Sequence, residues 1–324
     1  MEILKANLLS PIALAFALGI VTKLIKSEFS LPKEIYTGLS IFLLFSLGLK
    51  GGVELGHATF DSVAWPVVVT LALGCVTPLT TYFVLRVVGK FSVSDAAGIA
   101  AHYGSVSAVT YIAAMTFVKS QNAEPEGFMP TLLTLLESPG IHIALAIGAI
   151  KTAQPGQSLK AVLHEVLTAR TMILLVGGLL VGLAMGEKNW GSIEGFFDTK
   201  GPVFKGALTL FLLEMGIVAG SRFGDLKKVG PFLLGFGVVM PVLHGALGTW
   251  LGTLAGLSVG GATVLGTMAA SASYIAAPPA VRVTLPEANP TYYLTSSLAV
   301  TFPFNILFGI PLYFQISQAL HGGG

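Results

Sequence analysis

Long apolar runs separated by short polar breaks occupy almost the whole chain, and this pattern limits what the chain can fold into. A helix that crosses a lipid bilayer needs about 20 consecutive, mostly apolar residues. Only 10% of the 324 residues are charged, against roughly 25% in a soluble globular domain. So few charges could not cover the surface of a soluble domain of this length. The pattern therefore predicts an integral membrane protein.

The apolar runs predict an all-α membrane protein with ten transmembrane helices. We place them at residues 7–24, 35–53, 64–89, 93–118, 130–150, 169–186, 203–221, 231–256, 259–285 and 291–318. The N-terminal run has no small-x-small cleavage site, so we interpret it as the first span and not as a signal peptide. Lys and Arg are about twice as frequent after odd-numbered spans as elsewhere, which predicts both termini outside and residues 151–168 as a cytoplasmic linker.

An internal repeat relates the two halves of the chain. The segment GLSIFLLFSLGLKGGVELG (38–56) aligns without gaps on GALTLFLLEMGIVAGSRFG (206–224), and GSVSAVT (104–110) falls on ASASYIA (270–276). We therefore predict a first five-helix repeat at residues 1–150 and a second at 169–324. Because five is an odd number, the second repeat would be inserted in the opposite orientation, which is the inverted-repeat plan of secondary transporters.

The fourth and ninth spans contain the small polar residues and prolines that a lipid-facing helix avoids. A helix in lipid must satisfy its backbone groups internally, so such segments occur where protein shields them or where they line a wet cavity. In the ninth span Pro279 has no amide hydrogen to donate, and it disfavours helical geometry at Pro278. We therefore expect a break near residues 273–279. The matched segment of the fourth span, 96–117, is rich in Gly, Ala and Ser. We expect an interruption there too.

Interrupted helices offer two kinds of binding group near the middle of the membrane. A helix N-terminus carries about half a positive charge and free amides, which suit a small anion, whereas unwound carbonyls and hydroxyls suit a cation such as sodium. Gly104 would let a ligand approach the backbone closely. The hydroxyls belong to Ser105, Ser107, Thr110, Ser271, Ser273 and Tyr274. The alternative is that these small residues only allow tight helix packing.

Two acidic residues, Glu137 and Glu214, lie deepest in apolar surroundings. Glu137 could coordinate sodium or hold a helix end, and both roles stay open. No Asp or Glu occurs at residues 96–123 or 226–286, which argues against an obligatory proton exchanger, because such a protein needs a titratable carboxylate where the spans cross. His102 either lines the cavity or is satisfied within the interior.

Motifs for catalysis and nucleotide binding are absent from the sequence. It has no Walker loop, no G-x-S-x-G elbow and no Cys/His metal cluster. The lone Cys75 excludes a disulfide framework, and we expect it to pack within a span. We therefore expect no enzyme activity, no cofactor apart from a coupling ion, and no nucleic-acid partner.

Three segments resemble the sodium-dependent bicarbonate transporter family of cyanobacteria (SbtA type). They are MAASASYIAAPPAVRVTLPEANPTYYLTSSLAV (268–300), GIVAGSRFGDLKKVGPF (216–232) and YGSVSAVT (103–110). The most specific parts are the APP-x-VR and P-x-ANP elements and the SR-x-G-D-L-K-KV loop. The resemblance covers nearly the whole chain.

Membership of that family would imply a gate domain from spans 1, 2, 6 and 7, a mobile core from the other spans, and elevator-like alternation. It also implies a homotrimer in the bacterial inner membrane, with a PII-like cytoplasmic regulator as a candidate partner. The implied substrate site consists of Gly104, Ser105, Ser107, Ala270, Ser271, Ala272 and Ser273. The implied sodium ligand is Thr110, to which we add Tyr274 and Glu137.

The chain departs from the family pattern in two places. Members carry an Asp where this chain has Tyr274, which leaves the sodium-to-anion ratio open. They also carry a longer linker than residues 151–168. The sequence therefore favours a divergent symporter that imports bicarbonate with sodium. A sodium symporter for another small anion or carboxylate, a proton-coupled exchanger and a passive anion channel remain alternatives.

Overall fold

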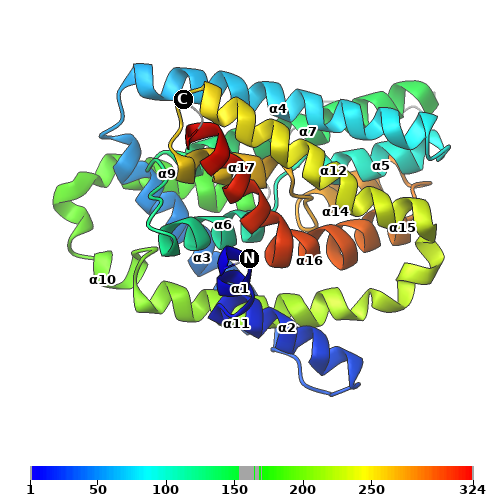
Figure 1. Ribbon diagram of the computed structural model, residues 1–324, viewed down its shortest axis with the longest axis horizontal. Helices are drawn as coiled ribbons and strands as arrows, with labels where there is room; N and C mark the ends of the chain where they lie inside the picture. Colours follow the sequence, from blue (N-terminus) through cyan, green and yellow to red (C-terminus); the bar gives the residue numbers. More distant parts are fainter. Residues whose placement is uncertain (1, 153–163, 165–167, 169, 323–324) are drawn as a thin grey trace.

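The computed structural model describes residues 2–152, 164, 168 and 170–322, and the regular structure in these ranges is entirely helical. The long helices α4 and α11 run close to the horizontal direction of Figure 1, and α12 crosses the view obliquely. The α-helices are α1 (Glu2–Leu8), α2 (Pro11–Leu24), α3 (Lys33–Leu55), α4 (Phe60–Val87), α5 (Val93–Tyr103), α6 (Ala108–Ser120), α7 (Met129–Thr152), α9 (Arg170–Trp190), α10 (Glu194–Phe197), α11 (Pro202–Ser221), α12 (Leu226–Leu254), α13 (Val259–Ala269), α14 (Ala277–Thr284), α15 (Pro290–Thr295), α16 (Phe302–Phe304) and α17 (Ile310–Gly322). A short 3-10 turn, η1 (Phe223–Asp225), precedes α12, and two π-helical segments, η2 (Ser296–Thr301) and η3 (Asn305–Gly309), interrupt the last span.

The described helices are long and apolar enough for a multi-pass membrane protein. Six segments qualify as candidate spans by length and composition, or seven if α1 and α2, which are bent by 57°, form one span. Residues 194–254 are counted once among the six although they contain both α11 and α12. The ten-span arrangement stays a prediction. Most of the predicted linker, residues 151–168, lies outside the described residues.

The helices pack as two groups. We call α2, α3, α9 and α11 the four-helix group, in which α2 packs along α11 and α3 packs along α9. We call α4 to α7 together with α12 to α17 the broken-helix group, because it contains the α5–α6 and α13–α14 pairs. Fewer contacts join the groups, chiefly those of α7 with α3 and α9. This division leaves an interface that runs through the protein.

Glycines bring the backbones of the four-helix group into direct contact. A Cβ atom added to Gly216 would lie 2.1 Å from the carbonyl oxygen of Phe16 on α2, and one added to Gly19 would lie 2.0 Å from that of Leu213. The same close approach joins α3 to α9, where Gly48 lies against the backbone of Gly178. No other residue fits such distances. The two helix pairs therefore pack backbone to backbone, which resists sliding of one helix past its partner.

Candidate functional site

Both predicted helix interruptions are present in the structure. The first lies between Tyr103 and Ala108, and the second lies between Ala269 and Ala277. The expectation that the double proline forms part of the second break is wrong, because Pro278 and Pro279 lie in the first turn of α14. Amides in the first turn of a helix have no carbonyl partner within it, so proline is tolerated there.

The two breaks are joined by hydrogen bonds that backbone amides donate. The amide of Ser107 donates to the hydroxyl oxygen of Ser271 over 3.0 Å. In return, the amide of Ser273 donates to the carbonyl oxygens of His102, at 2.8 Å, and Ser105, at 3.1 Å. The segments that leave helical geometry therefore satisfy one another inside the protein, which is what a broken span requires in the absence of water.

Serines cap three of the four half-helices, α5, α6 and α13. Ser107 caps α6 by accepting a hydrogen bond of 3.3 Å from the amide of Thr110. Ser273, at the corresponding position, accepts one of 3.3 Å from the amide of Ala276, but α14 begins only at Ala277 and has no side-chain cap. The earlier halves start in the same way: Ser92 accepts from the amide three residues on, at 3.0 Å, and Ser258 does so at 3.1 Å. Such caps fix the point at which each helix begins.

A small buried cavity lies against the N-termini of α6 and α14. Its volume, taken as the space open to the centre of a water molecule, is about 20 Å³, which holds an occupant about the size of one water molecule. The lining residues are Ser40, Leu43, Leu44, Val106, Ser107, Ala108, Val109, Ile112, Glu137, Thr171, Phe211, Ser273, Tyr274, Ile275 and Ala276. No Lys or Arg is among these fifteen residues, so within this wall the helix N-termini are the groups that offer positive charge to an anion.

Four of the predicted site residues line this cavity, namely Ser107, Ser273, Tyr274 and Glu137. Tyr274 fills one side, where its ring packs edge-on against Phe302 with centroids 5.3 Å apart. The other candidates are not among the lining residues, although all are buried: Gly104, Ser105, Thr110, Ala270, Ser271 and Ala272. Their roles as ligands stay predictions.

The candidates away from the cavity hold the breaks in place. Ser271 donates its hydroxyl to the carbonyl of Met268 while it accepts from Ser107. The carbonyl of Ala270 accepts a hydrogen bond of 2.9 Å from the side-chain amide of Asn305. The bare backbone of Gly104 makes room for Gly140 on α7, where an added Cβ would overlap the Gly104 carbonyl. These contacts pack helix against helix around the site.

The two deep acids have different surroundings. Glu214 accepts a hydrogen bond of 2.9 Å from the amide of Leu31, so it anchors the connection between α2 and α3. Glu137 is 3% exposed, faces the cavity, and makes no hydrogen bond or ion pair with any residue that the structure describes. An ionised carboxylate in such a place needs a counter-charge. Glu137 is therefore the better candidate for a cation ligand.

His102 belongs to the interior and not to the cavity wall. Its Nδ1 lies 2.7 Å from the carbonyl of Gly98, and its ring stacks on Tyr293 with centroids 4.4 Å apart. The residues that sequence reasoning missed are Ser40, Thr171 and Phe211, which form the opposite wall. They belong to the four-helix group, and no local pattern in the sequence indicates that they face the breaks.

The cavity communicates with one end of the interface. A vestibule of about 420 Å³, measured in the same way, shares Ser40, Leu44, Thr171, Ile275 and Ala276 with the cavity wall. It also contains Arg170, with which α9 begins. We call the end of the interface at which the vestibule lies the linker end. The vestibule gives the candidate site an approach from that side.

Apolar side chains close the route toward the opposite end. Leu44 and Ile112 line the cavity, while Leu47 and Met115, about one turn further along α3 and α6, line the next hollow. Leu47 and Ile112 are each 2% exposed. The cavity therefore lies between the two helix groups and adjoins the vestibule at the linker end.

The family model for the Na+-dependent bicarbonate transporter superfamily matches residues 11–318, which is nearly the whole chain. The chain belongs to this superfamily. The resemblance carried by the APP-x-VR, P-x-ANP and SR-x-G-D-L-K-KV elements is thus confirmed. No curated protein matches the chain. The Na+-dependent bicarbonate transporter superfamily is a family of membrane transporters and not of enzymes, which agrees with the all-helical fold and the apolar spans.

Proposed function

We propose that this member of the superfamily is a secondary active transporter that carries bicarbonate, or an anion of closely similar size and charge, together with sodium. The observation that carries the proposal is the composition of the cavity. It combines two helix N-termini and two serine hydroxyls with the unpaired carboxylate of Glu137, and its wall contains no basic side chain.

The groups around the cavity are suited to a pair of opposite ions, although the cavity must widen beyond its present volume of about 20 Å³ to admit them. Each helix N-terminus offers partial positive charge to an anion. The carboxylate and the hydroxyls offer oxygen ligands to a sodium ion. Each ion improves the site for the other because the surroundings have a low dielectric constant. Mutual stabilisation of this kind is the physical basis of obligatory symport.

The helix packing supports the inverted-repeat part of the proposal. Ser92 and Ser258 cap corresponding half-helices, and Ser107 and Ser273, at the same separation along the sequence, each accept a hydrogen bond from the amide three residues on. The helix contacts also follow the proposed repeat. The contact of α2 with α11 corresponds to that of α9 with α3, and the contact of α6 with α13 corresponds to that of α14 with α5. We infer ten spans in two inverted repeats, at residues 1–150 and 169–324.

Alternating access would then be a movement of one helix group against the other. The four-helix group corresponds to spans 1, 2, 6 and 7 of the proposed arrangement and would be the gate, while the broken-helix group would be the moving core. We further propose both termini outside, a bacterial inner-membrane location and a homotrimer. A PII-like regulator stays part of this proposal, because the linker it would contact lies mostly outside the described residues.

The decisive experiment is uptake of radiolabelled bicarbonate into proteoliposomes, with external sodium replaced by choline in a parallel sample. We expect saturable uptake that requires sodium. Ser107→Ala and Ser273→Ala should each raise the KM for bicarbonate, because both hydroxyls line the cavity. Unchanged uptake in choline would exclude sodium symport and favour a passive anion channel. Normal KM values in both variants would place the substrate elsewhere.

The identity of the anion is tested by competition in the same assay. Unlabelled bicarbonate should inhibit uptake at the lowest concentration, and small carboxylates such as formate and acetate should inhibit weakly. If a carboxylate competes better than bicarbonate and is itself transported with sodium, the protein is a symporter of that carboxylate.

A further inference from the structure

Three lysines surround a hollow at the end of the interface opposite the linker. Lys119 lies near the end of α6, Lys200 precedes α11, and Lys205 lies in its first turn. The hollow has a volume of about 270 Å³, again as space open to the centre of a water molecule. Its other lining residues are Thr116, Ser120, Glu124 and Thr199. We call this hollow the lysine pocket.

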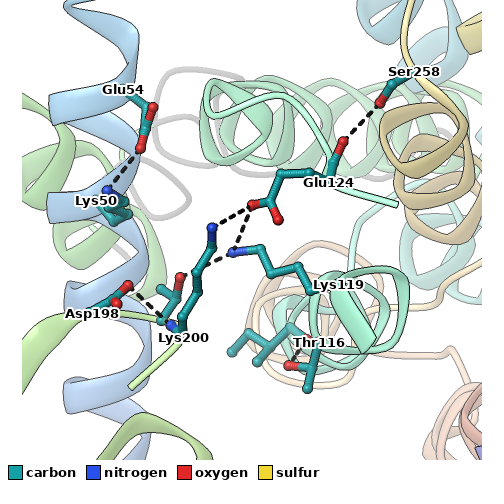
Figure 2. A network of polar contacts seen from close by, with 10 residues as sticks. Lys50, Glu54, Thr116, Lys119, Glu124, Asp198, Lys200 and Ser258 are labelled. Atoms are coloured by element: carbon teal, nitrogen blue, oxygen red, sulfur yellow. Dashed lines mark hydrogen bonds and ion pairs between the residues drawn. The ribbon is translucent and has the colours of Figure 1, made fainter. Parts of the chain in front are cut away.

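The carboxylate of Glu124 faces two of these lysines, Lys119 and Lys200, as Figure 2 shows. Glu124 lies 3.0 Å from the ammonium group of Lys200 and 3.9 Å from that of Lys119. Lys119 also donates a hydrogen bond of 3.4 Å to the hydroxyl of Thr199. Lys205 makes no ion pair with any residue in the described ranges. The wall of the lysine pocket therefore carries an excess of positive charge.

Neighbouring charges do not cancel this excess. Lys50 and Glu54 compensate each other across 2.8 Å on α3. Asp198 accepts a hydrogen bond of 3.1 Å from the backbone amide of Lys200 and adds one negative charge nearby. The pair of Glu124 with Lys200 is more than half exposed on both sides, and exposed pairs of this kind contribute little to stability. A small ion in solution can therefore displace Glu124.

We propose that the lysine pocket binds a small oxyanion, which competes with Glu124 for Lys119 and Lys200. Lysine ammonium groups bind oxyanions as mobile point charges, and Thr116 and Ser120 add hydroxyls to the wall. Lys119 and Glu124 also line the adjoining hollow that Leu47 and Met115 close. The bound anion thus lies at the closed end of the interface. Its use in transport rests on the proposed function, whereas its binding does not.

Glu124 also connects the two helix groups. It lies between α6 and α7 of the broken-helix group, while Lys200 lies in the connection from α10 to α11, next to the four-helix group. An anion that takes the place of Glu124 removes an ionic contact across the closed end. Binding of the anion and release of that contact are therefore one event, and Glu124→Gln should make both easier.

Charged thiol reagents test the pocket without any assumption about the transported substrate. The exposed Ser120 lines the pocket, so Ser120→Cys provides a reporter in a protein whose own exposed cysteine is removed by Cys75→Ala. In water a unit charge about 7 Å away changes the local concentration of a monovalent ion roughly threefold. An anionic and a cationic methanethiosulfonate should therefore differ about sevenfold in rate for each unscreened lysine.

The expected result is faster modification by the anionic reagent, with a rate ratio that falls on Lys119→Gln or Lys200→Gln and rises on Glu124→Gln. The exposed Lys188, at the end of α9, provides a matched control, and Lys188→Gln should leave the ratio unchanged. Bicarbonate should slow the anionic reagent and not the cationic one at equal ionic strength. Equal rates for both reagents, or a ratio that the lysine variants do not change, would overturn the proposal.

Transport kinetics separate this site from the proposed function. If bicarbonate is the substrate, Lys119→Gln and Lys200→Gln should raise its KM about threefold each at low salt and leave kcat unchanged, because they lower only the local anion concentration. Protection of Ser120→Cys by bicarbonate without any sodium-dependent uptake would support the pocket and refute the function. Sodium-dependent uptake with no charge selectivity at Ser120→Cys would do the reverse.

Discussion

The amide of Ser107 and the hydroxyl of Ser271, 164 residues apart in the sequence, lie 3.0 Å apart and join the two broken helices. The reciprocal bond runs from the amide of Ser273 to the carbonyl of His102. Each interruption thus provides the hydrogen-bond partner that the other lacks. The candidate site depends on this exchange, because the cavity lies directly beside it.

Removal of the Ser271 hydroxyl should destabilise the protein. Ser271→Ala leaves the buried amide of Ser107 without an acceptor, which costs roughly 1–3 kcal/mol. We expect a lower midpoint of thermal unfolding in detergent and reduced uptake. The control is Ser221→Ala, whose exposed hydroxyl bonds the carbonyl of Val218 on its own helix. If the two variants unfold at the same temperature, the bond between the breaks contributes nothing.

Neutralisation of Glu137 should weaken the dependence of uptake on sodium. Glu137→Gln keeps the size of the side chain but removes the negative charge beside the cavity, so the sodium concentration for half-maximal uptake should rise at least about tenfold, which corresponds to about 1.4 kcal/mol. Glu194→Gln, at the exposed start of α10, serves as control. A normal sodium curve for Glu137→Gln would mean that the carboxylate only supports the helix.

The residue at position 274 should set the number of sodium ions per anion. Tyr274→Phe keeps the ring against Phe302 and should preserve the coupling ratio, whereas Tyr274→Asp adds a second carboxylate to the cavity. An added sodium ion makes the cycle electrogenic, and each charge gains about 2.3 kcal/mol per 100 mV. Uptake by Tyr274→Asp should then increase with an inside-negative potential. Uptake that does not respond to voltage would contradict this prediction.

Glycines at the backbone contacts of the four-helix group should not tolerate alanine. The Cβ of Gly216→Ala would meet the carbonyl of Phe16 at 2.1 Å, so we expect a loss of at least about 1–3 kcal/mol. A Cβ added to Gly206, ten residues earlier on α11, would have no neighbouring atom within 4 Å. Gly206→Ala should be neutral or stabilising by up to about 1 kcal/mol. The midpoint of thermal unfolding in detergent measures both effects. Equal losses of stability in the two variants would contradict the backbone contact at Gly216.

A covalent link across the closed end should stop transport. In a Cys75→Ala background, Glu124→Cys and Lys200→Cys replace the partners of an ion pair that crosses the two helix groups. A short bifunctional thiol reagent should abolish uptake, and reduction should restore it.

The matched control for this link is Lys50→Cys with Glu54→Cys, which replaces an ion pair within the single helix α3. Treatment of that variant should leave uptake unchanged. Full activity of the protein linked between positions 124 and 200 would mean that this end of the interface does not open during transport.

The broken helices could be predicted from the sequence because their cause is local. Small polar residues and glycine at matched positions of the two spans favour interruptions that the protein shields from lipid, and both breaks are present in the structure. The position of the second break was predicted less well. Pro278 was expected to leave helical geometry, but a helix can begin just before it, since the first turn needs no amide partner.

The other wall of the cavity could not be predicted, because it depends on contacts between distant segments. Thr171 and Phe211 look like ordinary residues of apolar helices, and they reach the site only because α9 and α11 pack beside α3. The lysine pocket was missed for a similar reason. Lys119 lies far from Lys200 and Lys205 in the sequence, and nothing in the sequence places them around a common hollow.

The double proline at the start of α14 makes the two helix ends unequal. The first turn of α6 presents amide hydrogens, whereas Pro278 and Pro279 present hydrocarbon rings. A planar anion between them meets donors on one edge and fewer donors on the other. Bicarbonate has two kinds of edge, since one of its oxygens carries a proton, whereas the three edges of nitrate are equivalent. We therefore expect the site to distinguish ions of equal charge and nearly equal size by their symmetry.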